Sequence, residues 1–268
     1  QWLKGATTRS RIRLRHGEVT EVLTGWAQTD VGNIRIDNED AFWLEGKGNW
    51  YLALVADGMG GHQAGEVASQ RAVDVIQWTI EANIAQHGIT VDKIEKFLGD
   101  AVQAANKVIY RQGQSHPNLT GMGTTVTVAL FINQTVKIAH VGDSRAYLFR
   151  QGKLSQLTND HSLVQELVNS GSISPGEARN HPKRHLLTRV VGTAPDLDVD
   201  CFSLNVEPED IFLFCTDGLT GELTDDEIKA VLMSFPPSQA VEELVREANR
   251  RGGHDNITVL LIRAGDEP

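Results

Sequence analysis

Four acidic residues, each next to an apolar stretch, are the first feature of this 268-residue sequence that suggests chemistry. Three of the stretches end in an acid and the fourth begins just after one, at Asp57, Asp143, Asp217 and Asp255. Short apolar runs predict buried strands, and carboxylates held at strand ends are costly to gather unless they share cations. A single Asp-Gly pair often only opens a turn, so each acid alone has this simpler interpretation. Four together favour a metal site.

The type of ligand restricts the kind of metal. No Cys or paired His accompanies the four acids, and carboxylates select hard ions such as Mg²⁺ or Mn²⁺ over zinc. His181 and His185 are four residues apart, but Pro182 lies between them, which argues against a zinc pair. Two hard ions held about 3.5 to 4 Å apart lower the pKa of a water and direct it at phosphorus. The acids therefore predict metal-assisted hydrolysis of a phosphate ester.

Charge is unevenly distributed along the chain. With 25 Lys and Arg against 35 Asp and Glu, the net charge is −10, which argues against nucleic acid as a partner. Residues 1–16 nevertheless contain five basic residues and no acid, and residues 1–18 lack sustained periodicity, which predicts a basic arm or linker remnant. Residues 190–228 contain eleven acids and no Lys or Arg, and nearby metal ions would relieve their repulsion.

The sequence also carries signals about the cellular environment. No apolar run reaches the roughly 20 residues of a membrane span, and no signal peptide is visible, although the chain begins at Gln1 without Met. Cys201 and Cys215 lie in apolar stretches without zinc spacing, which predicts reduced core thiols. We therefore expect a cytoplasmic protein, and a monomer.

Strand and helix patterns alternate along the chain. Apolar or alternating runs predict strands at residues 22–28, 41–45, 50–56, 124–132, 135–141, 146–150, 198–204, 211–215 and 256–263. Apolar residues at helical spacing predict helices at residues 64–85, 92–111, 225–233 and 238–250. This order favours an α+β fold, a four-layer α-β-β-α sandwich of two antiparallel sheets flanked by helix pairs.

Seven short motifs occur in order along residues 20–264. They are RIDNEDA (35–41), VADGMGGH (55–62), GE (65–66), GMGTT (121–125), VGDSR (141–145), CTDGL (215–219) and GHDNIT (253–258). In this order and in these strand contexts, the motifs resemble those of the bacterial type of the PP2C-type (PPM) metal-dependent serine/threonine protein phosphatases. The resemblance implies a bacterial signalling enzyme that hydrolyses phosphoserine and phosphothreonine in phosphorylated proteins.

The resemblance also assigns metal ligands. It implies two Mn²⁺ or Mg²⁺ ions at one end of the sandwich and a metal-bridging water that attacks phosphorus directly. Asp57 would bridge both ions, and the Gly58 carbonyl would bind one of them. Asp217 and Asp255 would hold the other ion.

Further ligands are implied around this pair of ions. Glu39 and Asp40 would act through water on the side of Gly58. Asp143 matches a position that, together with Asp217, supports a third and weaker metal in bacterial members.

Arg35 stands four residues before Glu39, where the family places its phosphate-binding arginine. A guanidinium suits this role because its planar fork donates two hydrogen bonds to phosphate oxygens. The simpler interpretation is a solvated surface arginine.

Residues 159–193 interrupt the strand pattern inside the expected phosphatase domain, residues 19–265. They correspond in place to the flap of bacterial members, which lies beside the active site and affects substrate choice. Ser162 or Asp160 is a candidate cap for one short helix, and Pro175 begins another. The basic residues Lys183, Arg184 and Arg189 suit the acidic or phosphorylated flank of a substrate, or are solvated.

His62 is the position at which the family resemblance leaves a role open. Eukaryotic members place a His directly after the Asp-Gly pair as proposed general acid, but that position is Met59 here. The bacterial pattern carries His62 three residues later. His62 either protonates the leaving oxygen, for which a near-neutral pKa is suitable, or holds the loop by hydrogen bonding.

Two other functions compete with the protein phosphatase. A pseudophosphatase would use the fold only for binding, but Arg35, Asp57, Asp217 and Asp255 are all present, which disfavours it. A phosphatase of small phosphate esters is compatible with the same residues. A covalent phosphoenzyme is not expected, because Cys215 lies within an apolar strand and no Cys occupies a phosphate-cradling loop.

The two roles of His62 predict different outcomes for His62→Ala. A general acid is needed more by alkyl phosphates than by p-nitrophenyl phosphate, whose leaving group requires little protonation. The general-acid role therefore predicts a much larger rate loss on the alkyl phosphate, together with loss of one limb of the pH profile. Equal losses on both substrates, with weaker metal binding, would instead identify a structural role.

Overall fold

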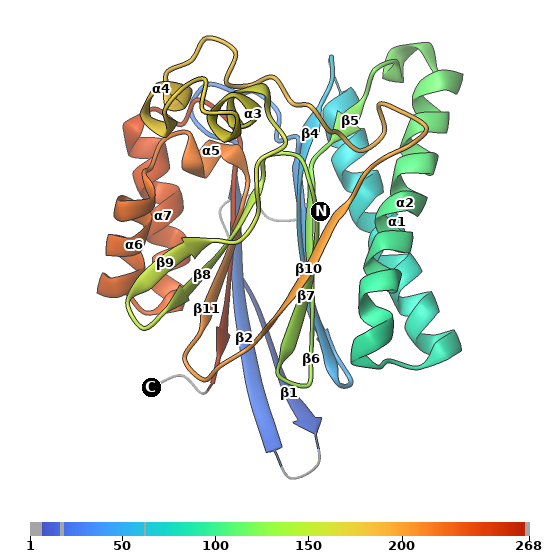
Figure 1. The fold of residues 1–268 in the computed structure, drawn as a ribbon, viewed down its shortest axis with the longest axis vertical. Helices are drawn as coiled ribbons and strands as arrows, with labels where there is room; N and C mark the ends of the chain where they lie inside the picture. Colours follow the sequence, from blue (N-terminus) through green and yellow to red (C-terminus); the bar gives the residue numbers. More distant parts are fainter. Residues whose placement is uncertain (1–6, 17–18, 62, 266–268) are drawn as a thin grey trace.

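The computed structural model describes residues 7–16, 19–61 and 63–265. Two antiparallel sheets face each other, and helices cover the outer face of each sheet (Figure 1). This arrangement confirms the expected four-layer sandwich.

The first sheet contains six strands, and both the first and the last strand of the described chain belong to it. In spatial order they are β1 (Thr8–His16), β2 (Val19–Asp30), β12 (Ile257–Ala264), β11 (Ile211–Cys215), β8 (Arg145–Arg150) and β9 (Lys153–Gln156). Every neighbouring pair in this sheet is antiparallel. The carboxyl end of β11 and the amino end of β12 therefore lie side by side at one end of the sheet.

The second sheet lies opposite and consists of consecutive hairpins joined by a long connection. Its order is β10 (Asp200–Asn205), β7 (Thr135–Val141), β6 (Val126–Ile132), β4 (Trp50–Met59) and β3 (Asp40–Lys47), and β5 (Gly123–Thr124) pairs with the end of β4. Central β4 is buried on both faces over residues 50–56. That explains why this stretch is continuously apolar rather than alternating.

Helices cover each sheet in pairs. On the second sheet lie α1 (Ala64–His87) and α2 (Val91–Ser115), and on the first lie α6 (Asp225–Ser234) and α7 (Pro237–Arg251) (Figure 1). The shorter elements are η1 (Pro117–Leu119), α3 (Leu163–Asn169), α4 (Pro175–Arg179) and α5 (Asp217–Thr220). Among the described residues, no helix combines the length and the apolar character that crossing a bilayer requires.

The two sheets are held together by a core of large side chains between them. Phe131 of the second sheet meets Phe212 of the first edge-to-face, with ring centroids 5.2 Å apart. Both rings are fully buried, and burying one such side chain contributes about 1.5 to 3 kcal/mol. This core fixes the spacing of the sheets and therefore of the residues at their ends.

Residues 8–16 differ from the expected arm, because they form strand β1 at the edge of the first sheet. Ile12 and Leu14 point into the core between the sheets, while Arg9, Arg11 and Arg13 are exposed on the opposite face. The alternation has the period of a half-buried strand. The arginines on its exposed face hid this pattern in the sequence.

The expected insertion contains the two short helices that the sequence predicts. Ser162 caps α3 by accepting a hydrogen bond from the backbone N–H of Gln165. Ser174 and Glu177 form a capping box at the start of α4. The inserted segment lies over one end of the sandwich (Figure 1).

Candidate metal centre

The predicted acids come from both sheets and meet at the same end of the sandwich. Asp40 and Asp57 lie opposite each other in the β3–β4 pair of the second sheet. Asp217 follows β11 of the first sheet, and Asp255 precedes β12 of that sheet by two residues. The site therefore spans the boundary between the two sheets.

Asp57 is at the centre of this cluster. Burial raises the pKa of its carboxyl well above the usual value, and the charges of Asp40, Asp217, Asp143 and Asp255 raise it further. Thus all four of the other acids act electrostatically on Asp57. Such repulsion is relieved when the carboxylates share cations.

Asp40 is anchored across the boundary between the sheets. Its Oδ2 accepts hydrogen bonds from the hydroxyls of Thr216, at 2.8 Å, and Thr258, at 2.7 Å. Thr216 directly follows β11 of the other sheet, and Thr258 lies in β12. Its Oδ1 is buried and has no hydrogen-bond partner. Burial, and secondarily the charges of Asp217 and Asp255, raise the pKa of Asp40 to about 7, although the two threonine bonds lower it.

Asp217 also has an unpartnered oxygen. It begins α5, and its Oδ1 is buried without a hydrogen-bond partner. Burial and then the charge of Asp255 raise its pKa, whereas the nearby positive charge of Arg35 lowers it. The unpartnered oxygens of Asp40 and Asp217 are the kind of buried acceptor that a hard cation satisfies.

Asp143 lies on the turn between β7 and β8, and burial followed by the charge of Asp217 raises its pKa. The turn is joined to Asp57 by a chain of hydroxyls. Thr125 Oγ1 accepts from the Asp57 backbone N–H at 2.9 Å and lies 2.7 Å from the hydroxyl of Ser144. This chain fixes the turn relative to the end of β4.

Gly58 continues β4 beyond Asp57 and packs tightly against the start of α1. A Cβ placed on Gly58 would lie 2.1 Å from the carbonyl oxygen of Gly65 and 2.6 Å from that of Glu39. Only glycine fits here without displacing backbone. The Gly58 backbone N–H donates to the Glu39 carbonyl at 3.1 Å, which fixes the loop before β3 beside the site.

Glu39 and Arg35 lie on this loop and face the acids. Burial raises the pKa of Glu39, while the charge of Arg35 lowers it. Arg35 Nη2 donates to Asp255 Oδ2 at 2.7 Å, and the Arg35 side chain remains 48% exposed. Its guanidinium is therefore both attached to the acidic cluster and open to solvent.

The carboxylate oxygens of these acids suit hard cations, although the side chains are not close enough together to surround an ion by themselves. Within the described residues, no three acidic, His or Cys side chains stand at the mutual distances of ligands around one ion. Ions such as Mg²⁺ keep several waters and need only one or two carboxylates each. Buried unpartnered oxygens on Asp40 and Asp217, and four acids whose charges act on Asp57, match that mode of binding.

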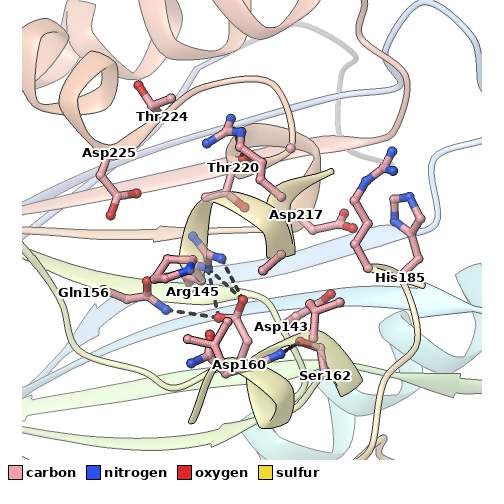
Figure 2. Close-up of a pocket in the computed structure, with 18 of the residues that line it drawn as sticks. Asp143, Arg145, Gln156, Asp160, Ser162, His185, Asp217, Thr220, Thr224 and Asp225 are labelled. Carbon is pink, nitrogen blue, oxygen red and sulfur yellow. Dashed lines mark hydrogen bonds and ion pairs between the residues drawn. The ribbon is translucent and has the colours of Figure 1, made fainter. Parts of the chain in front are cut away.

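A cavity of about 520 Å³ opens beside these acids. Asp143 and Asp217 lie on one part of its wall, near His185 (Figure 2). The inserted segment contributes apolar surface to the wall through Val164 and Val168. The cavity therefore connects the acidic cluster to the segment that was expected to be a flap.

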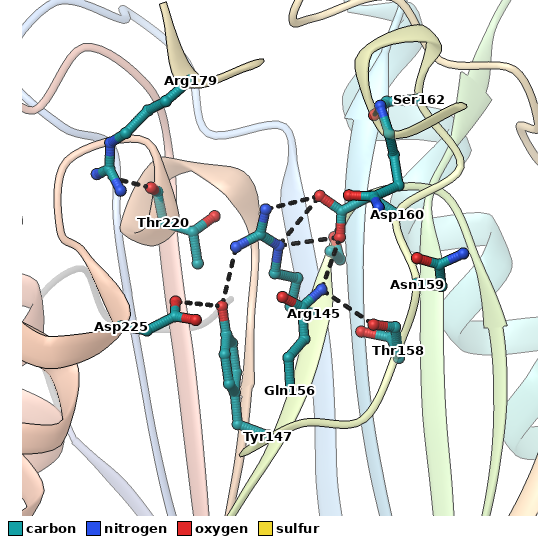
Figure 3. Close-up of polar contacts among 12 residues, drawn as sticks. Arg145, Tyr147, Gln156, Thr158, Asn159, Asp160, Ser162, Arg179, Thr220 and Asp225 are labelled. Atoms are coloured by element: carbon teal, nitrogen blue, oxygen red, sulfur yellow. Dashed lines mark hydrogen bonds and ion pairs between the residues drawn. The ribbon is translucent and has the colours of Figure 1, made fainter. Parts of the chain in front are cut away.

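A partly buried ion pair forms another part of the cavity wall. Arg145 donates from Nε and Nη2 to the carboxylate of Asp160, with a shortest distance of 2.7 Å. Its Nη1 donates to the hydroxyl of Tyr147, which in turn donates to Asp225 (Figure 3). This network joins the beginning of the inserted segment to β8 and α6.

The remaining predicted residues have different outcomes. His62 lies outside the described residues. Arg184 lines the cavity, whereas Arg189 Nη1 donates to Asp200 at 2.7 Å, so that Arg189 is an anchor of the inserted segment. Cys201 and Cys215 are both free thiols, the first half-buried and the second buried.

Sequence reasoning missed the residues that hold the acids in place. Besides Thr216 and Thr258, Asn256 is central to this support. Its Oδ1 accepts from the Glu39 backbone N–H at 2.7 Å, and its Nδ2 donates to the carbonyls of Val31 and Asp37. Asn256 thereby fixes the loop that carries Arg35. The Asn after Asp255 was visible in the motif GHDNIT, but its partners are distant in sequence.

The raised pKa values predict that Mn²⁺ stabilises the protein more at higher pH. Asp40, with a pKa of about 7 against an ordinary 3.8, binds more protons in the folded than in the unfolded chain between these values, so its contribution to stability is lost as pH rises. Mn²⁺ opposes this loss because it binds the deprotonated carboxylates.

The measurement is the melting temperature with saturating Mn²⁺ minus that with chelator, from about pH 5 to about pH 8. This difference should grow with pH. Buried His140, whose pKa burial lowers to about 3, affects both samples and cancels. A difference that stayed constant or shrank would contradict the assignment of these acids as cation ligands.

Comparison with known proteins identifies relatives over almost the whole chain. A family model described as Protein phosphatase 2C matches residues 34–260. The serine/threonine phosphatase stp of Listeria monocytogenes is 42% identical over 237 residues, which cover 88% of this chain and 93% of the relative.

Solved structures agree with the sequence comparison. Serine/threonine phosphatase Stp1 from Staphylococcus aureus superposes with a TM-score of 0.85 at 36% identity, over 96% of this chain and 100% of that one. The catalytic domain of serine/threonine protein phosphatase PstP, solved in complex with two manganese ions, gives a TM-score of 0.80 at 36% identity, over 92% and 100% of the two chains. The family model, the relative and both structures lead to one conclusion: this chain belongs to the protein phosphatase 2C family.

Proposed function

We propose that this chain is a metal-dependent protein phosphatase that hydrolyses phosphoserine and phosphothreonine in proteins, as a bacterial signalling enzyme. The observation that carries the proposal is the convergence of four acids on Asp57. It is supported by the names of the relatives, which are bacterial serine/threonine phosphatases. The manganese ions of the PstP structure support the same chemistry.

We assign the metal ligands as the family resemblance implies. Asp57 would bridge two Mn²⁺ or Mg²⁺ ions, with the Gly58 carbonyl on one side and Asp217 and Asp255 on the other. When bound, two such ions activate a water for direct attack on phosphorus. The unpartnered oxygen of Asp217 and the charge that Asp255 exerts on it support this assignment.

Glu39 and Asp40 would orient waters rather than bind an ion directly. Asp40 is suited to this because two threonine hydroxyls already occupy its Oδ2, leaving only Oδ1 available. Asp143 would support a third, weaker ion together with Asp217. The charge of Asp217, which raises the pKa of Asp143, supports that pairing.

Arg35 would bind the phosphoryl group of the substrate. Its side chain is half exposed and is attached through Asp255 to the acidic cluster, so its free guanidinium nitrogens lie beside the proposed ions. A planar guanidinium donates two parallel hydrogen bonds to phosphate oxygens. Arg35 thus orients the phosphoryl group and offsets its negative charge near the acids.

The site is built from one chain, and we propose a monomer in the cytoplasm. All proposed ligands and Arg35 lie within the same sandwich. Two free cysteines are usual in a reducing compartment. Light scattering of the purified chain tests the monomer, and cell fractionation tests the compartment.

Hydrolysis of a phosphothreonine peptide by the purified chain tests the function. We expect activity with Mn²⁺ or Mg²⁺ and none with chelator. Phosphopeptide turnover no faster than that of small phosphate esters would favour the competing function in small-ester hydrolysis. Binding of the phosphopeptide without turnover would favour a pseudophosphatase.

Asp217→Asn is expected to remove nearly all hydrolysis. The neutral amide weakens the hold on the cation, so activation of the water is lost. Turnover of phosphopeptide in saturating Mn²⁺ is the measurement. Asp92→Asn is the matched control, because it makes the same charge change at an exposed position in the first turn of α2, outside the cavity. Near-wild-type turnover of Asp217→Asn would refute its role as a ligand.

Arg35→Lys is expected to lower kcat/KM by about 10- to 100-fold. An ammonium cannot reproduce the two-pronged hydrogen bonding, and losing a charge-assisted hydrogen bond costs about 1.5 to 3 kcal/mol. Arg150→Lys serves as a control, since Arg150 also pairs with a carboxylate, that of Asp210, away from the acidic cluster. Equal kcat/KM values for wild type and Arg35→Lys would exclude Arg35 as the phosphate ligand.

A further inference from the structure

His161, at the start of the inserted segment, makes two bonds to one residue of the Asp143 turn. Its backbone N–H donates to the carbonyl of Gly142 at 2.7 Å. Its ring Nδ1 accepts from the Gly142 backbone N–H at 3.1 Å. The His161 residue is only 5% exposed, and its ring lies 4.8 Å from that of His140.

The hydrogen bonds around the ring require one tautomer. Because a backbone N–H donates to Nδ1, that nitrogen carries no proton, and the ring proton is on Nε2. Nε2 then donates to Asp200 Oδ2 at 3.1 Å. Asp200 also accepts from Arg189 through its other oxygen. A carboxylate on one ring nitrogen thus fixes the other as an acceptor, as it does for metal-bound histidines.

The backbone of Gly142 needs such support. Its φ is 111°, in the region that favours glycine. On its other side the residue packs against Thr125, since a Cβ on Gly142 would lie 2.6 Å from that side chain. Thr125 is itself bonded to the backbone of Asp57. The turn is therefore enclosed between the end of β4 and the ring of His161.

The hydrogen bond from Gly142 to the His161 ring is not needed to attach the inserted segment to the sandwich. Asp160 is already held by Arg145 through three hydrogen bonds. The backbone N–H of Thr188 donates to the His161 carbonyl at 2.8 Å, which pairs the two ends of the segment. The bond from Gly142 to Nδ1 is thus specific to the turn.

We propose that His161 is a positioning residue, which fixes the Gly142 backbone through Nδ1 and so holds Asp143 where it can support the third metal ion, with Asp200 setting the tautomer. The proposal rests on the assignment of Asp143 under the proposed function. His161 touches neither substrate nor metal. It acts only through the turn.

Nuclear magnetic resonance tests the bond directly in the full chain. A scalar coupling between the Gly142 amide nitrogen and His161 Nδ1 is expected, as are ¹⁵N shifts of an unprotonated Nδ1 and a protonated Nε2. Absence of the coupling, or a proton on Nδ1, would overturn the proposal.

Mn²⁺ binding to substituted proteins tests the consequence. Paramagnetic resonance of free Mn²⁺ during titration gives the affinities of the strong sites and of the weak site. His161→Leu removes the acceptor and should weaken the weak site by at least about tenfold, as loss of a supporting partner commonly does. His161→Asn should stay within about threefold, because its amide oxygen takes the place of Nδ1. Affinity of the strong sites should be unchanged in both.

Arg189→Gln is the matched control. It removes the other bond to Asp200 and loosens the end of the inserted segment, but leaves the bond between Gly142 and His161. We expect weak-site affinity within about threefold of wild type. If the leucine variant does not fold, His161→Gln replaces it, since glutamine reaches the position of Nε2 but not that of Nδ1.

The outcomes separate this proposal from the proposed function. A wild-type chain with no Mn²⁺ binding and no phosphatase activity would overturn the function itself. An active wild type without a weak site would overturn only the present inference. The same holds if His161→Leu keeps wild-type weak-site affinity, or if Arg189→Gln weakens that site as much as His161→Leu does.

Discussion

Mutual repulsion between buried carboxylates is the constraint on which the rest of this structure depends. Asp57 lies in the field of four other acids, and burial makes each added charge more costly. Strong packing must hold such acids together, and cations or protons must compensate their charge. The sandwich supplies the packing through rigid strands that end at one place. The cations that hard oxygen ligands select are also those that activate water toward phosphorus.

Most of the groups that hold the acids in place are neutral. Thr216 and Thr258 restrain Asp40 from the opposite sheet, and Asn256 fixes the loop before β3. Neutral donors restrain a carboxylate without cancelling its charge, so the acid remains available to an ion. Arg35 is the exception, because its pair with Asp255 places a positive charge at the rim. In the proposed function that charge binds the phosphoryl group of the substrate, while the hydroxyls and amides fix the geometry of the acids.

The sequence predicted the parts of the molecule whose pattern is local. Residues 50–56 are continuously apolar because β4 is buried on both faces, and the acids were visible at the strand ends. Strand β1 was missed because Arg9, Arg11 and Arg13 lie at every second position and dominate the apparent composition. The bond between His161 and Gly142 joins residues 19 apart through an irregular segment, so no periodicity records it. Arg189 looked available for substrate because its partner Asp200 lies 11 residues later, at the start of β10.

The division of the acids between two sheets has a thermodynamic consequence. Asp40 and Asp57 belong to one sheet, while Asp217 and Asp255 adjoin the other, so ions held between them would act as cross-links across the sandwich. Linkage is reciprocal: if bound ions favour one spacing of the sheets, any change in that spacing alters ion affinity by the same free energy. A substitution of Phe131 or Phe212, in the core between the sheets, would then change the affinity for metal ions.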